Sequence, residues 1–162
     1  MGGNYNRIGG FVLVIDTKTR IKQHEGFSPT VYTDSLGFQT IGYGHLVIEK
    51  DNFKEGEIYS PEELEGVFNQ DYEIAKNDGQ SIIDNELNGL NGYSEEQKQI
   101  IESVLIEMCF NLGKPRVLKF KNFLQALRDK DFDKAKAEML DSRWAVQVKS
   151  RALILSDMIG KL

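Results

Sequence analysis

Two carboxylates and a hydroxyl near the start of the chain have the types and spacing that acid–base chemistry needs. Eight residues separate Glu25 from Asp34, and five separate Asp34 from Thr40. Hydrolysis of a glycosidic bond uses two carboxyl groups that flank it: one protonates the leaving oxygen, and the other attacks the sugar or activates water. A chain with 25 acidic residues offers many such pairs, so composition alone does not single out this one.

Other catalytic classes have weaker support in the sequence. No Gly-x-Ser-x-Gly elbow occurs, and neither His24 nor His45 lies in a recognisable pattern with a serine or a cysteine. One cysteine and two histidines form no ligand cluster at zinc spacing. The stretch from Gly42 to Gly44 lacks the third glycine and the strand-to-helix context of a dinucleotide loop. We therefore expect neither a metal nor a cofactor.

The elements around the carboxylates should bring them near each other. Asp16 or Thr17 can cap a short helix that Gly26 ends, which places Glu25 on its last turn. Residues 30–45 are rich in Tyr, Thr, Ile and Phe and contain the turn residues Asp-Ser-Leu-Gly, a pattern typical of a β-hairpin. Asp34 and Thr40 would flank its turn, with alternation directing Thr40 and Ile41 to opposite faces.

The rest of the chain predicts helices. Ser60, Pro61 and Glu63 are typical of the start of a long helix, whose apolar stripe contains Asp71. A carboxylate in that position needs a partner if it is buried. Residues 94–113 predict a helix that is apolar over most of its surface and forms the centre of the core.

Three shorter amphipathic helices are expected over residues 120–127, 132–140 and 146–159, separated by residues 128–131 and 142–144. Arg151 falls on the apolar face of the last one, beside Leu155. Two interpretations stay open: its stem covers apolar surface while its guanidinium reaches water, or the side chain is buried and pairs with an opposite charge.

The overall composition indicates one globular domain. The chain has 162 residues with 40% hydrophobic and 28% charged side chains. Residues 1–113 hold 8 Lys and Arg against 19 Asp and Glu, whereas residues 114–162 hold 12 against 6. The basic part could meet an anionic polymer or consist of solvated helix faces. Cys109 lies in an apolar run, which is typical of a small core residue.

A longer motif makes the carboxylate pair specific. The segments His24-Glu-Gly-Phe, Tyr32-Thr-Asp34 and Gly37-Phe-Gln-Thr40-Ile-Gly-Tyr-Gly-His45-Leu46 resemble the active-site signature of the phage T4-type lysozymes, glycoside hydrolase family 24. Further motifs resemble the family in the same order along residues 16–155: Leu64 to Asp71, Phe110-Asn-Leu-Gly113, and Ser142-Arg-Trp144 with Arg151-Ala.

This resemblance implies roles for individual residues. Glu25 would be the general acid, Asp34 the carboxylate that positions or deprotonates water, and Thr40 the hydroxyl that holds that water. It further implies two structural ion pairs, His45 with Asp71 and Arg151 with Glu25. Leu46 and Phe110 would contact the glycan.

The resemblance also implies the fold and the activity. We expect an α+β, mainly helical, lysozyme-like domain: an N-terminal extension (1–15), a small β-hairpin lobe (27–60), a connecting helix (61–80) and a helical lobe (81–162) on which the 16–26 helix packs. The implied activity is that of a peptidoglycan hydrolase, a muramidase that cleaves the β-1,4 bond between N-acetylmuramic acid and N-acetylglucosamine with inversion. Its partner would be bacterial peptidoglycan rather than nucleic acid, and the enzyme would be a monomer.

Two rival functions differ in their products. A lytic transglycosylase uses one acidic residue and forms a 1,6-anhydro ring, and the presence of both Asp34 and Thr40 disfavours it. The presence of Glu25 together with Asp34 and Thr40 disfavours a catalytically silent wall-binding module.

No segment approaches the roughly 20 apolar residues that span a bilayer, and no signal peptide is visible. We therefore expect synthesis in the host cytoplasm, with action on the cell wall after release.

Overall fold

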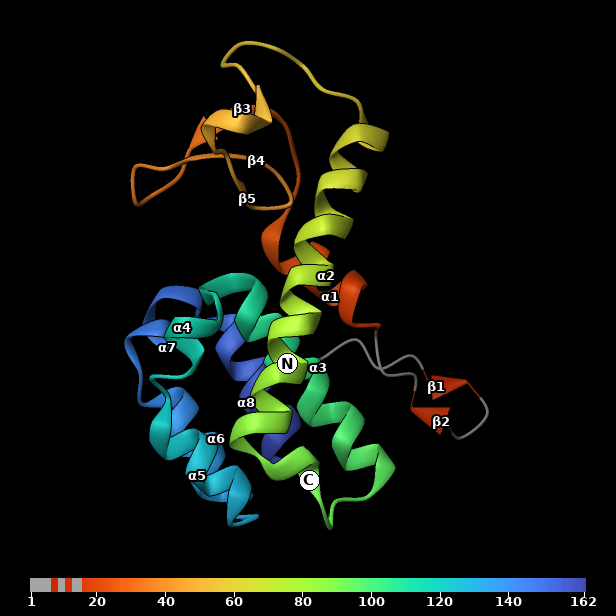
Figure 1. Cartoon of the computed structure of the whole chain (residues 1–162), viewed down its shortest axis with the longest axis vertical. Helices are drawn as coiled ribbons and strands as arrows, with labels where there is room; N and C mark the ends of the chain where they lie inside the picture. Colours follow the sequence, from red (N-terminus) through yellow and green to blue (C-terminus); the bar gives the residue numbers. More distant parts are fainter. Residues whose placement is uncertain (1–6, 9–10, 13–15) are drawn as a thin grey trace. The chain divides into compact units, whose positions relative to one another are not determined.

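The structure is a computed structural model that describes residues 7–8, 11–12 and 16–162 (Figure 1). The chain divides into two compact units: one spans Val14–Ile74, and the other includes Ala75–Leu162. The expectation of an N-terminal extension at residues 1–15 falls mostly outside the described residues. Of that stretch, the structure describes only β1 (Arg7–Ile8) and β2 (Phe11–Val12), which pair antiparallel.

The first unit begins with the short helix α1 (Thr17–Glu25). The Asp16 side chain caps it by accepting a hydrogen bond from the Thr19 amide at 3.2 Å. The helix ends at Gly26, whose φ of 69° a residue with a side chain rarely adopts. Both ends are therefore where the capping residues predicted them, and Glu25 is the last helical residue.

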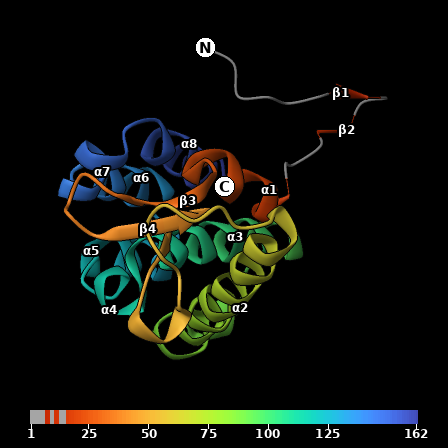
Figure 2. The same cartoon turned by 90° about the horizontal axis from the view of Figure 1, so that it is seen from above.

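A three-stranded antiparallel sheet follows in the order β3 (Ser28–Thr33), β4 (Gln39–Gly42) and β5 (His45–Leu46). Figure 2 shows β3 and β4 from above. The first two strands form the predicted hairpin. Both faces of the central strand are covered, since Thr40 and Ile41 are 5% and 0% exposed. Ile41 joins a small core with Val31 and Leu64.

The long helix α2 (Pro61–Glu86) begins at the predicted proline, where the Glu63 amide donates to the Ser60 hydroxyl at 3.1 Å. It extends past the expected end at residue 80. A short 3-10 helix, η1 (Glu49–Asp51), lies between β5 and α2, and a second, η2 (Asn88–Leu90), follows α2.

The second unit is helical and surrounds the apolar helix α3 (Glu95–Leu112), which is capped by Ser94 and closed by Gly113 as predicted. The helices α4, α5, α6, α7 and α8 follow it: Lys114–Val117, Lys121–Arg128, Phe132–Leu140, Arg143–Val148 and Ser150–Gly160. Helix α6 contacts both α5 and α8, and α3 contacts α4 and α8 (Figure 1).

The end of the chain differs from the sequence-based expectation. Residues 142–144, predicted to separate two helices, instead start α7, because the Ser142 hydroxyl accepts a hydrogen bond from the Ala145 amide at 3.1 Å and caps the helix. The single helix predicted over 146–159 is broken at Lys149, which has a φ of 41°. The observed mainly helical architecture with a small three-stranded sheet is the lysozyme-like α+β fold expected from the resemblance.

Candidate active site

The Glu25 carboxylate lies against the backbone of Gly44, on the segment that joins β4 to β5. A Cβ atom built on Gly44 would lie 2.5 Å from Oε2 of Glu25 and 3.0 Å from its Cδ. Gly44 also has a φ of 76°, in the left-handed region. The backbone conformation therefore favours glycine at this position, and an added Cβ would displace the Glu25 carboxylate.

Helix α1 is held to the first part of α2 by two lysines. Lys22 Nζ lies 2.6 and 2.7 Å from the two carboxylate oxygens of Glu65, and Lys18 Nζ donates to Asn69 at 3.1 Å. Lys22 also lies over the Phe68 ring, 4.9 Å from its centroid. These contacts limit how far the end of α1, and with it Glu25, can move.

Asp34 is oriented by the hairpin turn that it starts. Its Oδ1 accepts hydrogen bonds from the amides of Leu36 and Phe38, each at 2.9 Å. This is the local bonding for which aspartate is favoured in turns. Among the described residues, none donates a hydrogen bond to Oδ2, so one carboxylate oxygen is fixed by the backbone while the other can meet a ligand.

Thr40 faces the same side of the sheet as Tyr32. The two residues are cross-strand partners on β3 and β4, and Thr40 is also paired with Leu46 on β5. Directly opposite residues in antiparallel strands project to the same face. The Thr40 hydroxyl donates to the carbonyl oxygen of Phe38 at 3.3 Å, and Leu46 is half exposed.

The pKa of Tyr32 responds to both carboxylates. Burial raises the pKa of Tyr32 first, and the negative charges of Glu25 and Asp34 raise it further. Glu25 and Asp34 thus both act on Tyr32 by charge, and Thr40 is the cross-strand partner of Tyr32. The sequence interpretation had included Tyr32 only as part of a motif and had given it no role.

His45 lies between two carboxylates. Its Nδ1 is 2.7 Å from Asp71, which is the pairing expected from the resemblance, and its Nε2 is 3.0 Å from Asp51. The hydrogen bond to Asp71 is the main cause that raises the pKa of His45; burial opposes it, and Asp51 adds to it. Sequence reasoning missed Asp51, although it lies only six positions after His45.

Asp51 is itself held by the backbone. Burial alone would raise its pKa, but the Ile48 amide, which donates to Oδ2 at 2.7 Å, and His45 lower it overall. The amide and the imidazole share one oxygen of the carboxylate. The 3-10 helix η1 is thereby attached to β5.

Arg151 is buried in the second unit, and its Nε lies 3.4 Å from Oε1 of Glu107. The two side chains are 6% and 1% exposed, so the interpretation with the guanidinium in water was wrong. Glu107 was missed, although it is the one carboxylate in the apolar run of residues 104–112 on α3, which was the available signal. The predicted pairing of Arg151 with Glu25 stays a prediction, because the two residues belong to different units.

Phe110, one of the two residues predicted to contact the glycan, lies on α3 and is half-buried.

Within the described residues, we find no group of three or more His, Cys, Asp or Glu side chains that could hold a metal ion. Burial raises the pKa of the Cys109 thiol to about 12, so it stays protonated at neutral pH. None of the helices in the described part of the chain is long and apolar enough to cross a membrane.

Comparison with known proteins identifies the family of the chain. Residues 22–155 match the family model of the phage lysozymes. The chain belongs to the phage lysozyme family. It is 28% and 29% identical to two probable T4-type lysozymes of Dictyostelium discoideum, with 86% of this chain and 91% of each relative covered. A peptidoglycan hydrolase of Pseudomonas phage phiKMV is 28% identical over 86% of this chain, which corresponds to 14% of that larger protein.

Membership of the phage lysozyme family assigns the general activity. The chain is a cell-wall hydrolase of the lysozyme type, and peptidoglycan is the substrate that fits its family. The matched region contains the helix end with Glu25, the hairpin with Asp34 and Thr40, and the His45–Asp71 pair.

Proposed function

We propose that this lysozyme hydrolyses the β-1,4 bond between N-acetylmuramic acid and N-acetylglucosamine in peptidoglycan, and that it inverts the anomeric configuration. The observation that supports the proposal is that the charges of Glu25 and Asp34 both act on Tyr32, whose cross-strand partner is Thr40. Glycoside hydrolysis requires two carboxyl groups that flank the bond to be broken.

Each of the three residues would have one role. Glu25 protonates the glycosidic oxygen as the bond breaks. Asp34, oriented through its Oδ1, accepts a proton from the attacking water on the opposite side of the sugar, and Thr40 holds that water. Inversion needs the two carboxyl groups to be about 6.5 to 9.5 Å apart, because the water must fit between Asp34 and the anomeric carbon.

The identity of the products tests this proposal. Purified peptidoglycan is digested with the full chain, the fragments are analysed by mass spectrometry, and the first-formed anomer is read by NMR before mutarotation. We expect reducing N-acetylmuramic acid ends in the α configuration, since one displacement by water inverts a β linkage. A β anomer would contradict inversion, reducing N-acetylglucosamine ends would contradict the bond assignment, and anhydro ends would indicate a lytic transglycosylase. Intact glycan would indicate a silent wall-binding module.

A further inference from the structure

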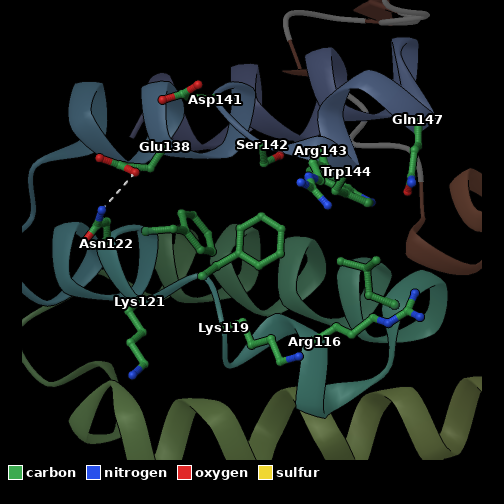
Figure 3. A pocket seen from close by; sticks show the side chains of 13 residues that line it. Arg116, Lys119, Lys121, Asn122, Glu138, Asp141, Ser142, Arg143, Trp144 and Gln147 are labelled. Atoms are coloured by element: carbon green, nitrogen blue, oxygen red, sulfur yellow. Dashed lines mark hydrogen bonds between the residues drawn. The ribbon is translucent and has the colours of Figure 1, made fainter.

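The turn between α2 and α3 contains the same three residues twice. Residues 87–92 have the sequence Leu-Asn-Gly-Leu-Asn-Gly, and no other asparagine of the chain precedes a glycine (Figure 1). The two leucines are 4% and 2% exposed, whereas both asparagines and both glycines are exposed. A pocket of the same unit is lined by residues of the range 112–147, so the turn is not part of it (Figure 3). The proposed hydrolysis gives these residues no role.

An asparagine followed by glycine can lose its side-chain amide without a catalyst. The glycine nitrogen attacks the asparagine Cγ and forms an N–Cγ bond. The Cγ–Nδ2 bond breaks, and the side-chain nitrogen leaves as ammonia with the proton that water carries to it from the glycine nitrogen. Water then opens the resulting succinimide ring at one of its two carbonyl groups. The product is aspartate or isoaspartate, in which the main chain runs through Cγ. Glycine favours the attack because it has no Cβ to shield its nitrogen.

Ring closure requires one particular backbone torsion of the asparagine. The ring contains Cγ, Cβ, Cα, the main-chain carbonyl carbon and the glycine nitrogen, so Cβ and that nitrogen must be nearly eclipsed about the Cα–C bond. In an L residue Cβ is offset from the backbone nitrogen by about 120° around this bond, so eclipsing requires a ψ of about −120°, which is the ψ of the first central residue in a type II′ turn. This torsion distinguishes the two asparagines.

Asn88 can reach the reactive torsion by the rotation of a single peptide group. Asn88 and Gly89 have φ values of 51° and 62°. The Leu90 amide donates to the Leu87 carbonyl oxygen at 3.0 Å and closes the turn. Positive φ at both central residues is the mark of a type I′ turn. A type II′ turn has the same positive φ at its first central residue and the same closing hydrogen bond, so only the peptide between Asn88 and Gly89 must rotate.

The surroundings of Gly89 leave room for this rotation. Among the described residues, the Gly89 amide donates no hydrogen bond, and a Cβ built on Gly89 would have nothing within 4 Å. Glycine also adopts either sign of φ at little cost. The Asn88 carbonyl oxygen accepts a hydrogen bond from the Asn91 amide at 3.3 Å. Both residues are exposed, so water can replace that hydrogen bond as the peptide turns.

Asn91 is held in a turn of another type. Its φ and ψ are −58° and 133°, and Gly92 has a φ of 81°. The Tyr93 amide donates to the Leu90 carbonyl oxygen at 3.1 Å. These are the features of a type II turn, and rotation of its central peptide gives a type I turn with a ψ of about −30° instead of −120°. Lys130 also donates to the Gly92 carbonyl oxygen. Asn91 therefore reaches the reactive torsion only if the closing hydrogen bond of its turn breaks.

We propose that Asn88 is a site of spontaneous deamidation, and that the fold makes it react faster than Asn91. Conversion adds one negative charge to the turn, and isoaspartate also adds one backbone atom between α2 and α3. A cation already binds the main chain nearby, since Arg128 donates to the carbonyl oxygen of Glu86 at 2.8 Å. The inference goes beyond the proposed function and does not depend on it.

The two sites are matched controls for each other, because both have the local sequence Leu-Asn-Gly. The full chain is incubated at mildly alkaline pH for several weeks, and a parallel sample is kept unfolded in guanidinium chloride. Peptide mass spectrometry measures the replacement of NH2 by OH at each asparagine, and an isoaspartyl methyltransferase labels isoaspartate. We expect Asn88 to react about tenfold faster than Asn91 in the folded protein, a difference of roughly 1.4 kcal/mol in activation free energy. In the unfolded chain the two sites should react at nearly equal rates.

Substitutions check which residue gives the product. Asn88→Gln should remove the fast conversion, and Asn91→Gln should keep it. Equal rates at the two sites of the folded protein would overturn the proposal, because the turn type would then have no effect. Faster reaction at Asn91 would overturn it as well, and so would an Asn88 that stays intact in the folded protein while the unfolded chain reacts. Glycan cleavage is not part of the measurement, so failure of the proposed hydrolysis is a separate outcome.

Discussion

The Glu25 carboxylate lies so close to Gly44 that a Cβ on the glycine would be 2.5 Å from Oε2. The end of α1 and the segment between β4 and β5 are therefore fitted to each other. An alanine at position 44 should therefore displace the carboxylate, an effect that a change in backbone strain alone would not produce.

We expect Gly44→Ala to lower kcat about a hundredfold, because displacement of a catalytic group by about 1 Å can cost that much. Gly56→Ala is the matched control: Gly56 has a φ of 84°, but nothing lies within 4 Å of its added Cβ. Both variants should lose about 1 to 2 kcal/mol of stability from the left-handed backbone conformation. Steady-state hydrolysis and thermal unfolding of both variants check this. Equal kcat values for the two variants would refute the role of the contact.

The pKa of Tyr32 should report the charges of both carboxylates. Because Glu25 and Asp34 raise it by Coulomb repulsion, Glu25→Gln and Asp34→Asn should each lower it toward 10, and the double variant should lower it further. The titration is followed by NMR of ring-labelled tyrosine, with Tyr32→Phe to assign the signal. An unchanged Tyr32 titration in all three variants would mean that the carboxylates are not close to this hydroxyl.

The contacts of His45 predict a stability that depends on pH. Because the pKa of His45 is raised in the folded protein, its contribution to the free energy of unfolding is complete below pH 6.5. That contribution is lost as the pH rises through the pKa of the folded state. Because the pKa of Asp51 is lowered in the folded protein, its contribution to the free energy of unfolding is complete above pH 3.8. That contribution is lost as the pH falls through the pKa of the folded state. Both contributions to stability should therefore be complete between pH 3.8 and pH 6.5.

His45→Asn should lower the free energy of unfolding by about 2 kcal/mol near pH 5.5, the magnitude typical of hydrogen bonds to charged groups, and by less near pH 9. Urea denaturation of both proteins at a series of pH values measures the difference. A difference that stays constant from about pH 5.5 to 9 would contradict the linkage.

The buried pair of Glu107 and Arg151 should show strong coupling. Removing one partner leaves the other charge buried, so Glu107→Ala should cost about 3 to 5 kcal/mol of stability. The double variant with Arg151→Met should cost less than the sum of the two single variants. Chemical denaturation of the four proteins completes the cycle. A coupling energy below about 0.5 kcal/mol would show that the two charges do not stabilise each other.

Local signals in the sequence predicted the elements well. Asp16, Ser60 and Ser94 each stand at the start of a helix because a side-chain oxygen next to an amide favours that position in any fold. The hairpin turn at Asp34 was predicted for the same reason. Where a local signal was misinterpreted, as at Ser142, the residue had the chemistry of a cap but was assigned to a connection.

Contacts that depend on how the elements pack were harder to predict from residues alone. Nothing local indicates that Asp51 meets the second nitrogen of His45, because that contact depends on how η1 follows β5. Glu107 and Arg151 lie 44 positions apart and meet only because α3 packs against α8. The family resemblance supplied the pairing of His45 with Asp71, which is present in the structure.

Substitution of Glu25 by its neutral isostere tests the central claim most directly. The rate of peptidoglycan hydrolysis is measured for the native chain, for Glu25→Gln, and for Glu49→Gln, which neutralises an exposed glutamate of η1 in the same unit. We predict that Glu25→Gln lowers kcat by about a hundredfold to ten-thousandfold, the usual contribution of a general acid, and that Glu49→Gln keeps the native rate. A folded Glu25→Gln protein with nearly native kcat would contradict the assignment of Glu25 as the acid.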